Sequence, residues 1–489
     1  EKVDNGYLFE GLKIAECGEE ILKHQQQYPV IFLTLKSAKQ PTYEMAYACL
    51  VGEICKEFER HSYVLQGEMS QRNREIFERI SLGKGSDDEY ATAFAFLSEC
   101  LFKYHKKKAI ILIDEYDVPL ENAYFRGFYD EMIDFIRSLF ESALKTNPYL
   151  EKSVITGCLR ISKESIFTGL NNLETDSVLH TRFGDSFGFT QEEVEGLLAY
   201  YGLSEQLEEV KKWYDGYLFN DFEIYNPWSI LKYVNDRKDH VTEFALPYWS
   251  NTSSNSIVRE MVGEADEMAK ADLETLMAGG TIEKQVHEDI TYGDIHQTQD
   301  NLWNFLFFTG YLKKVGERTV ANNLWLEMKI PNIEVATIYE NSISYWFEQR
   351  MKETDRSPLK HALETGDCEA AENFINEQLF DTISYFDYDE KFYHGLLLGM
   401  LNDYIVASNK EYGLGRADIA ILPRSIMDRG LILELKIATS MAEVRSMAQK
   451  ACEQIRQKKY MEGLLANGYE DVIGYGIAFY KKLCVITKV

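Results

Sequence analysis

The chain has 489 residues, 45% of them hydrophobic and 13% aromatic, which is enough for two to four domains with apolar cores. Its formal net charge of −27 argues against a protein that coats nucleic acid with its whole surface, although a local basic cleft is compatible with it. The cysteines form no CxxC pair, no apolar run reaches the length of a membrane span, and the N-terminus lacks a signal-peptide pattern. We therefore expect a cytoplasmic protein with reduced thiols and no membrane partner.

Strands alternate with helices through the first 220 residues, which predicts βαβ units and a parallel sheet. A capping box at Thr190 and Glu193 starts the last of these helices. The expected strands are Val30–Leu35, Ala109–Ile113, Ser153–Gly157 and Asp185–Thr190, and the expected helices are about 43–65, 88–104, 127–146 and 191–201.

The apolar run Ala109–Ile113 ends in two carboxylates, Asp114 and Glu115. Such a run is typical of a strand buried on both faces, and carboxylates after it lie where open α/β sheets bind ligands. This is the Walker B pattern of a nucleoside triphosphatase, in which Asp114 would hold Mg²⁺ and Glu115 would orient the attacking water. The alternative is a buried strand whose acids only begin a loop.

Five motifs follow one another in a fixed order: LIDEYDVPL, TGCLRISKESIFTGLNN, FGFTQEEV, WYDGYLF and IYNPWSIL. This series resembles the AAA-ATPase-like family common in anaerobic bacteria, whose members usually carry a PD-(D/E)xK nuclease-like domain behind the ATPase. The resemblance implies an α/β, P-loop-NTPase-type parallel sheet, ATP as a ligand, and Asp114 and Glu115 as the Walker B pair. It also implies that Arg160 reads the γ-phosphate, although Arg160 could instead cap a helix or form a salt bridge.

The phosphate-binding pattern G-x-x-x-x-G-K-[ST] is absent from the sequence. Its nearest approach, Gly83–Ser86, has Glu78 where the first glycine should stand, so we expect a turn there. Without this loop there are no stacked N–H donors and no phosphate lysine. The sequence thus argues against ATP hydrolysis by this chain, and we expect a chain truncated before its first strand and phosphate loop.

The pattern changes from about residue 221. Helices dominate residues 227–279, and an aromatic-rich helix over Asn301–Gly316 runs into a hairpin completed by Asn322–Asn332. A helix followed by a two-stranded hairpin indicates a winged helix. Because the helix carries no run of Lys and Arg, we expect a lid or packing module rather than a DNA reader. A Glu-rich helical connector follows over residues 335–380.

The C-terminal part holds a second set of chemical residues, within GRADIAIL and GLILELK. Period-two geometry places Glu434 and Lys436 on one face of a strand and Leu433 and Leu435 on the other. Asp418 approaches Glu434 if the two strands pair. We expect Asp418, Glu434 and the backbone carbonyl of Leu435 to bind Mg²⁺ or Mn²⁺, and Lys436 to position or deprotonate the attacking water. The alternative is ordinary charge alternation on an exposed strand.

Residues beyond this pair of strands could complete the site. Gln454 and Tyr460 match the A-x-x-Q-I-x-x-K-x-Y pattern that follows in many such domains, where they would brace Lys436 or contact the phosphate backbone, or be simple helix residues. Glu411 is our choice for the remaining superfamily acid, with Glu390 as the alternative, and His394 is expected to be a core histidine. The local cations Arg416, Lys436, Arg456, Lys458 and Lys459 suit a cleft for nucleic acid.

We therefore predict an ATPase-like core (residues 1–220), a helical or winged-helix-like lid (221–334), a connector (335–380) and an α/β restriction-endonuclease-like domain (381–489). The predicted function is metal-dependent hydrolysis of nucleic acid, DNA being the expected substrate, in a protein that could form a homo-oligomer. The alternatives are a nucleotide-regulated scaffold whose nuclease-like fold only binds nucleic acid, and an ATPase switch that signals to protein partners.

Overall fold

A computed structural model describes residues 5–158, 173–240, 244–251, 265–288, 299–380, 390–401, 405–422 and 428–489, with a few isolated positions between them. Contacts between Cα atoms divide the chain into two compact units. One comprises residues 1–183, 284–312 and 317–326, and the other comprises 184–283, 313–316 and 327–489. No helix within the described ranges combines the length and apolarity that crossing a bilayer requires.

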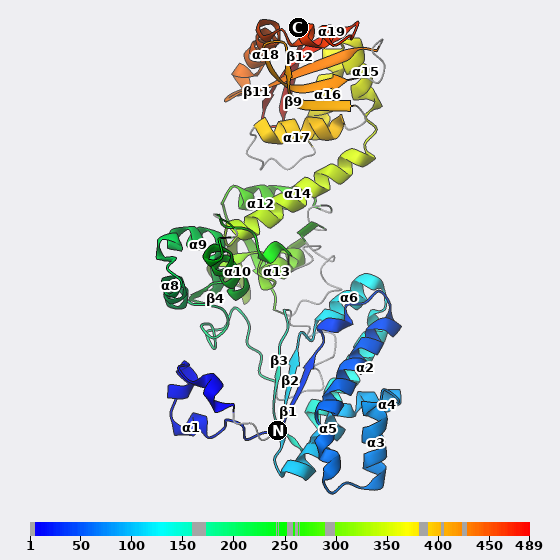
Figure 1. Ribbon diagram of the computed structural model, residues 1–489, viewed down its shortest axis with the longest axis vertical. Helices are drawn as coiled ribbons and strands as arrows, with labels where there is room; N and C mark the ends of the chain where they lie inside the picture. The colour runs from blue at the N-terminus through cyan, green and yellow to red at the C-terminus, as the bar shows by residue number, and fades with distance from the viewer. Residues whose placement is uncertain are drawn as a thin grey trace. The chain divides into compact units, whose positions relative to one another are not determined.

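The first unit contains a parallel sheet in the order β1-β2-β3, with α2 packed on β1 and α5 on β2 (Figure 1). On β2, Ala109, Ile111 and Ile113 are buried, whereas the residues of the opposite face are only half-buried. The sequence predicted burial on both faces, and the structure shows it on one face only. The elements are η1 Gly6–Phe9, η2 Lys13–Glu16, α1 Glu19–Leu22, β1 Val30–Thr34, η3 Lys36–Ala38, α2 Tyr43–Arg60, η4 Ser62–Gln66, α3 Gln71–Ser81, α4 Asp87–Ala91, α5 Ala93–His105, β2 Ala109–Asp114, α6 Val118–Arg126, α7 Tyr129–Phe140, the π-helical turn Glu141–Lys145 and β3 Leu150–Ile155.

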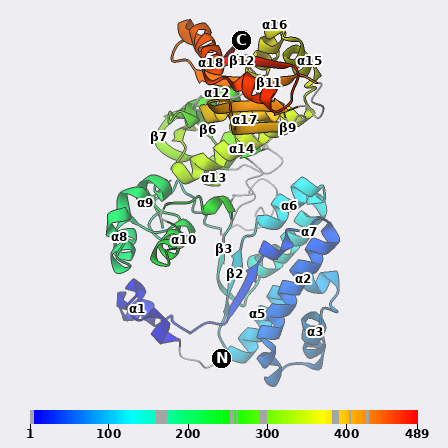
Figure 2. The same cartoon turned by 45° about the horizontal axis from the view of Figure 1, so that its top comes forward.

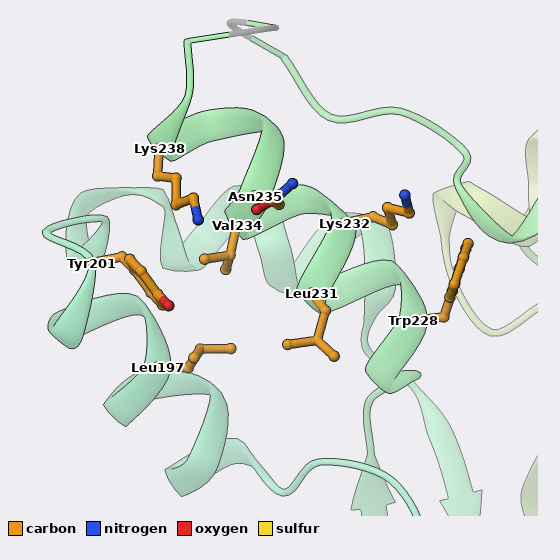
Figure 3. A pocket seen from close by; sticks show the side chains of 8 residues that line it. All are labelled: Leu197, Tyr201, Trp228, Leu231, Lys232, Val234, Asn235 and Lys238. Atoms are coloured by element: carbon orange, nitrogen blue, oxygen red, sulfur yellow. The ribbon is translucent and has the colours of Figure 1, made fainter.

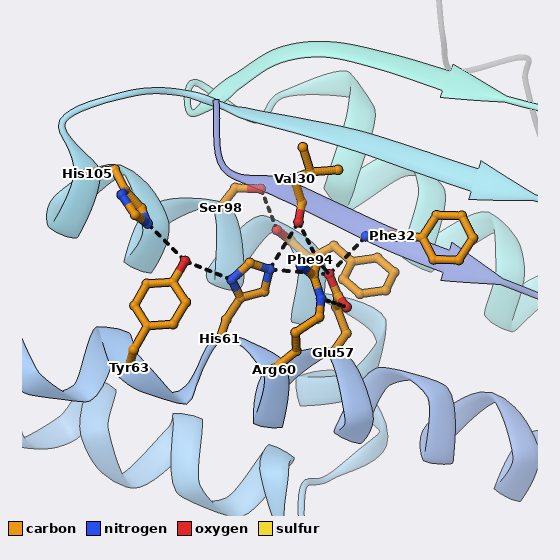
Figure 4. Close-up of polar contacts among 9 residues, drawn as sticks. All are labelled: Val30, Phe32, Glu57, Arg60, His61, Tyr63, Phe94, Ser98 and His105. Carbon is orange, nitrogen blue, oxygen red and sulfur yellow. Dashed lines mark hydrogen bonds and ion pairs between the residues drawn. The ribbon is translucent and has the colours of Figure 1, made fainter. Parts of the chain in front are cut away.

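Strand β1 lies at the edge of this sheet, and side chains of α2 bond its outward backbone groups (Figure 4). The Phe32 N–H donates to Glu57 Oε1 at 2.9 Å. The Val30 carbonyl accepts from Arg60 at 2.5 Å, and His61 Nε2 lies 3.0 Å from the same oxygen. An unpaired strand edge is a template for pairing with another chain. These contacts occupy that edge and explain why Glu57 is buried.

Three expectations about local structure can be compared with the fold. The capping box at Thr190 and Glu193 is present at the start of α8 (Gln191–Tyr200), as predicted. The predicted strand Asp185–Thr190 is wrong, because only Phe189 forms an isolated bridge, to Tyr225. The turn predicted at Gly83–Ser86 is confirmed, with Gly83 at φ +69°.

The middle of the chain is mainly helical. Its hairpin β7–β8 turns at Ala321 and Asn322. Both residues have positive φ, as a two-residue hairpin turn of type I′ requires. The sheet order β6-β8-β7 adds a third strand to the predicted hairpin. The elements are η6 Ser204–Gln206, α9 Leu207–Tyr214, β4 Tyr217–Phe219, β5 Phe222–Ile224, α10 Pro227–Lys238, η7 Trp249–Asn251, α12 Glu267–Met277, β6 Ile282–Val286, α13 Gln299–Phe308, β7 Lys313–Val320, β8 Asn323–Lys329 and α14 Ile333–Glu353.

The C-terminal part is built on a five-stranded sheet in the order β13-β12-β11-β10-β9, in which only β11 and β12 are parallel. Helices α18 and α15 lie on opposite sides of it (Figures 1 and 2). The elements are α15 Ser357–Thr365, α16 Cys368–Phe380, α17 Glu390–Met400, β9 Ile405–Tyr412, β10 Gly415–Leu422, β11 Gly430–Ile437, η9 Met441–Glu443, α18 Val444–Lys458, α19 Tyr460–Ala466, β12 Val472–Tyr480 and β13 Leu483–Lys488.

One hydrophobic core joins this sheet to helices that precede residue 381. Leu363 of α15 and Ile375 of α16 belong to the same buried cluster as Leu433 of β11. The second face of the sheet is covered by α18, which approaches so closely that a Cβ on Gly476 would lie 2.2 Å from the Ala448 carbonyl oxygen. Both faces of β11 are therefore covered, and for this reason even polar residues of the strand are shielded from solvent.

Candidate active site

Strands β10 and β11 bring the predicted acids together. Their antiparallel register pairs Ile419 with Leu433 and Ala420 with Ile432. Asp418 and Glu434 each stand one residue beyond the Ile419–Leu433 pair, on opposing strands. Side chains directly opposite each other on an antiparallel pair share a face of the sheet. The predicted approach of the two carboxylates is thus present in the fold.

The two faces of β11 separate apolar from polar residues. Leu433 and Leu435 are fully buried and lie in the core with the residues of α15, α16 and α17, as predicted. Ile432, on the alternate face, packs with Ile455 of α18. Glu434 and Lys436 continue that second face by the period of two. The strand therefore buries a carboxylate between its own backbone and a helix.

Hydrogen bonds connect the predicted residues. Lys436 Nζ donates to Glu434 Oε1 at 3.0 Å, with 1% of the Glu434 side chain and 25% of the Lys436 side chain exposed. The backbone N–H of Leu435 donates to Asp418 Oδ2 at 2.8 Å. The carboxylate of Asp418 thus binds the chain between the two residues of the E-x-K pattern.

The second carboxylate oxygen of Glu434 is buried and has no hydrogen-bond partner within the described part of the chain. Burial and the nearby charge of Asp418 together raise the pKa of Glu434 to about 7, against the opposing effect of Lys436. A buried carboxylate oxygen without a donor is costly, because its desolvation is not compensated. A further positive charge beside this oxygen would therefore be stabilised by the site.

A divalent cation fits these groups. Carboxylate and carbonyl oxygens are the ligands that Mg²⁺ and Mn²⁺ prefer, and Glu434 Oε2 is an acceptor without a donor beside a second carboxylate. The residues that would hold the ion are Asp418, Glu434 and, through its carbonyl, Leu435. Across the described ranges, no three or more His, Cys, Asp or Glu side chains are grouped so that they could hold a metal ion, and this site contributes two carboxylates.

Tyr460 contacts β10, and Gln454 contacts Tyr460. The buried Tyr460 hydroxyl donates to the Arg416 carbonyl at 2.8 Å. Gln454 Nε2 lies 3.5 Å from that hydroxyl. Burial raises the pKa of Tyr460, and the charges of Glu434 and Asp418 add to the rise. Tyr460 thus holds β10 two residues before Asp418.

His394 of α17 contacts the same strand at Asp418, one of the residues predicted to bind metal. Its Nε2 lies 3.1 Å from the carbonyl oxygen of Asp418. The sequence suggested a satisfied core histidine, and this contact supplies its partner. Its proximity to Asp418 could not be inferred from the chain alone, since 24 residues separate the two.

The third acid of the predicted site is described only in its backbone. The backbone of Glu411 is paired with Arg416, on β9 beside β10. The side chains of Glu411 and of its alternative, Glu390, lie outside the described residues. Of the predicted cations, Arg416, Arg456, Lys458 and Lys459 are exposed. The register alone places Glu411 near the strand that carries Asp418.

The N-terminal acids end β2 as predicted. Asp114 Oδ1 accepts a hydrogen bond from the Thr156 hydroxyl at 2.7 Å. Glu115 follows with a positive φ of 53°, and its carboxylate lies 4.0 Å from Lys36 Nζ on the protein surface. Thr156 follows β3, so the polar residues of neighbouring strand ends meet at one edge of the sheet. Arg160 lies outside the described residues.

Comparison with known proteins gives matches for both ends of the chain. Residues 1–167 match the AAA-ATPase-like family, described as predicted AAA-ATPases, and residues 388–489 match a family of the PD-(D/E)XK nuclease superfamily. An uncharacterized protein in the vnfD 5′ region of Azotobacter chroococcum mcd 1 is 27% identical over 230 residues, which are 47% of this chain and 41% of that protein. The match thus spans less than half of the length of this relative. No solved structure matches the chain.

These matches coincide with the two sites described above. Asp114, Glu115 and the parallel sheet lie within the first matched range, and Asp418, Glu434 and Lys436 lie within the second. The chain therefore joins an AAA-ATPase-like domain, residues 1–167, to a domain of the PD-(D/E)XK nuclease superfamily, residues 388–489.

Proposed function

We propose that the C-terminal domain is a Mg²⁺- or Mn²⁺-dependent nuclease that hydrolyses phosphodiester bonds, with DNA as the expected substrate. One observation carries this proposal. Glu434 is buried with one carboxylate oxygen bonded to Lys436 and the other without a partner among the described residues. A purely structural acid in this position would be more stable as an apolar residue.

Each residue has a role that follows from its contacts. Asp418 and Glu434 hold the negative charge that binds the cation, and the Leu435 N–H keeps the Asp418 carboxylate directed toward β11. When bound, a divalent metal supplies positive charge that stabilises the developing charge on the phosphate. Lys436 Nζ, 3.0 Å from Glu434 Oε1 and partly exposed, can orient the attacking water by hydrogen bonding.

Hydrolysis then proceeds by one substitution at phosphorus. The water oxygen bonds to phosphorus and gives up a proton, the bond to one ester oxygen breaks, and the departing alkoxide takes up a proton. The exposed cations Arg416, Arg456 and Lys458 can neutralise the flanking phosphates, so a local basic surface offsets the net charge of −27.

The test is Mn²⁺-dependent cleavage of supercoiled plasmid and of single-stranded DNA by the chain and by Lys436→Ala. Lys450→Ala is the matched control, because Lys450 is an exposed lysine on α18 outside the site. We expect the rate to fall about 10²–10⁴-fold in Lys436→Ala, as for loss of a positioned proton-transfer or water-orienting group, and to be unchanged in Lys450→Ala. Equal cleavage by all three proteins would refute the proposed site.

A second candidate is a domain that binds nucleic acid without cutting it. The exposed cations beside the site favour it, because phosphate binding does not need Lys436 or a metal. A gel-shift assay without metal separates the two functions. Retained binding with no cleavage by the parent chain in Mg²⁺ or Mn²⁺ would establish the binding function instead.

A further inference from the structure

The hairpin that joins β9 to β10 carries an exposed leucine close in the chain to the proposed active site. Tyr412 pairs with Gly415, so Gly413 and Leu414 form a two-residue turn between the strands. Gly413 has a φ of +57°, and a glycine with positive φ at the first position of such a turn is typical of type II′. Leu414, at the second position, is 69% exposed. The hairpin therefore presents a large apolar side chain to solvent at its tip.

Backbone contacts hold this tip against the junction of α18 and α19. The Leu414 N–H donates to the Lys458 carbonyl at 2.7 Å. A Cβ on Gly413 would lie 2.2 Å from the Lys459 carbonyl oxygen, and a Cβ on Gly463 would lie 2.4 Å from the Gly413 nitrogen. The backbones of the tip and the junction are thus in direct contact. Because the tip is fixed in advance, little conformational entropy is lost when Leu414 meets a partner.

The segments that meet at the tip are positively charged. Residues 412–416 and 453–463 carry four exposed cations: Arg416, Arg456, Lys458 and Lys459. The exposed acids of the same two segments are Glu453 and Glu462. This surface therefore attracts an anion, although the chain as a whole has a net charge of −27.

A DNA duplex matches this combination of one apolar side chain and several cations. Its interior is an apolar stack of bases, and its rim carries phosphates. Apolar side chains of several DNA-binding proteins enter between base steps in this way and unstack them. A protein partner needs a broader apolar surface, since a specific interface buries about 800 Å² on each partner. Leu414 is the only large apolar residue exposed across residues 412–416 and 453–463, which the structure describes throughout.

The pocket between α8 and α10 combines apolar residues and lysines in a different shape (Figure 3). Lys232 and Lys238 line it together with Leu231. Its volume of about 330 Å³ lies at the lower end of the range for small-molecule pockets, so a duplex cannot enter it. Contact with the bases of a duplex requires a projecting side chain, and the hairpin tip provides one.

We propose that Leu414 inserts into a duplex DNA substrate and opens a base step near the cut, while Lys458 and Lys459 bind the flanking phosphates. This inference rests on the nuclease function proposed above and names duplex DNA as the substrate. Leu414 precedes Asp418 by four residues, which is about 13 Å in an extended strand. Nucleotides follow one another along a DNA strand at about 3.4 Å, so the opened step should lie about four nucleotides from the scissile phosphate.

The first test needs no cleavage. A duplex carrying 2-aminopurine, whose fluorescence rises on unstacking, is titrated with the full chain in the absence of metal. We expect Leu414→Ala to bind the duplex without the rise that the parent produces, and Leu414→Met, which keeps an apolar side chain, to restore it. Leu231→Ala is the matched control, because Leu231 is 51% exposed and lies in the pocket on α10, and it should give the same rise as the parent. Circular dichroism checks the folding of each variant.

The second test measures cleavage of duplexes in Mn²⁺. Opening a step costs least at a mismatch, so we expect Leu414→Ala to cut a matched duplex about tenfold more slowly than the parent and to recover when a single mismatch is placed at the opened step. Mismatches at successive positions then locate that step relative to the cut.

The two tests separate the wedge from the nuclease function. A Leu414-dependent fluorescence rise without cleavage by the parent would support the insertion and remove the nuclease function. Cleavage of a matched duplex by Leu414→Ala at the parental rate, a parent that binds without a rise, or an equal loss of the rise in Leu231→Ala would each overturn the insertion.

Discussion

Glu334, at the start of α14, provides the sharpest test of how this fold treats a buried charge. Its side chain is fully buried. The carboxylate accepts hydrogen bonds from the Ser229 hydroxyl, at 2.8 Å to Oε2, and from the Trp249 N–H, at 2.8 Å to Oε1. Burial raises the pKa of Glu334 to about 7, and these hydrogen bonds only partly offset the effect. No cation is among the groups that shift it.

The raised pKa converts into a free energy of unfolding. The ordinary value is 4.5, so the difference from about 7 corresponds to about 3 kcal/mol, since one pKa unit is worth about 1.4 kcal/mol. The folded chain holds the proton more tightly than the unfolded chain. The stability is therefore complete below pH 4.5 and is lost as the pH rises toward 7, where the folded state must carry a buried charge.

Glu334→Gln removes this loss while keeping an amide that can bond to both Ser229 and Trp249. We expect the variant to match the parent near pH 5 and to exceed it by about 3 kcal/mol near pH 8. The assay is urea unfolding at several pH values, with hydrogen exchange of peptides from α10 and α14 to report the local opening. Glu340→Gln, on the exposed side of the same helix, is the control. A constant difference between parent and Glu334→Gln across this pH range would refute the reasoning.

Two further predictions concern packing and the sheet edge. Gly476→Ala places a Cβ 2.2 Å from the Ala448 carbonyl oxygen and must move α18 from the sheet, so we expect it to cost more than about 2 kcal/mol in urea unfolding. Gly196→Ala, in an open position of α8, should instead stabilise by about 0.5–1 kcal/mol, and equal effects of the two would contradict the packing described. Glu57→Gln removes the buried anion that bonds Phe32 and Arg60 (Figure 4), and we expect a cost of about 3 kcal/mol. Glu53→Gln, which breaks only a surface pair, should cost less than about 1 kcal/mol, and a similar loss for both would show that the edge contacts add nothing.

The elements that the sequence predicted well are those with strong local patterns. The apolar run before Asp114, the capping box at Thr190 and the alternation around Glu434 each depend on neighbours in the chain, and each is present in the fold. The strand predicted at residues 185–190 failed because an apolar stretch becomes a strand only where a partner strand pairs with it, and here one bridge forms.

The sequence by itself therefore singled out the residues of the proposed sites: two carboxylates and a lysine at strand spacing, and an acidic pair after an apolar strand. Only the tertiary structure decided how deeply these residues are buried and which groups they bond to. It buried Glu434 beneath α18, left one of its oxygens without a donor among the described residues, and placed the Tyr460 hydroxyl on the Arg416 carbonyl. The physical reason is that burial and electrostatic environment arise from contacts between distant parts of the chain, which no local pattern encodes.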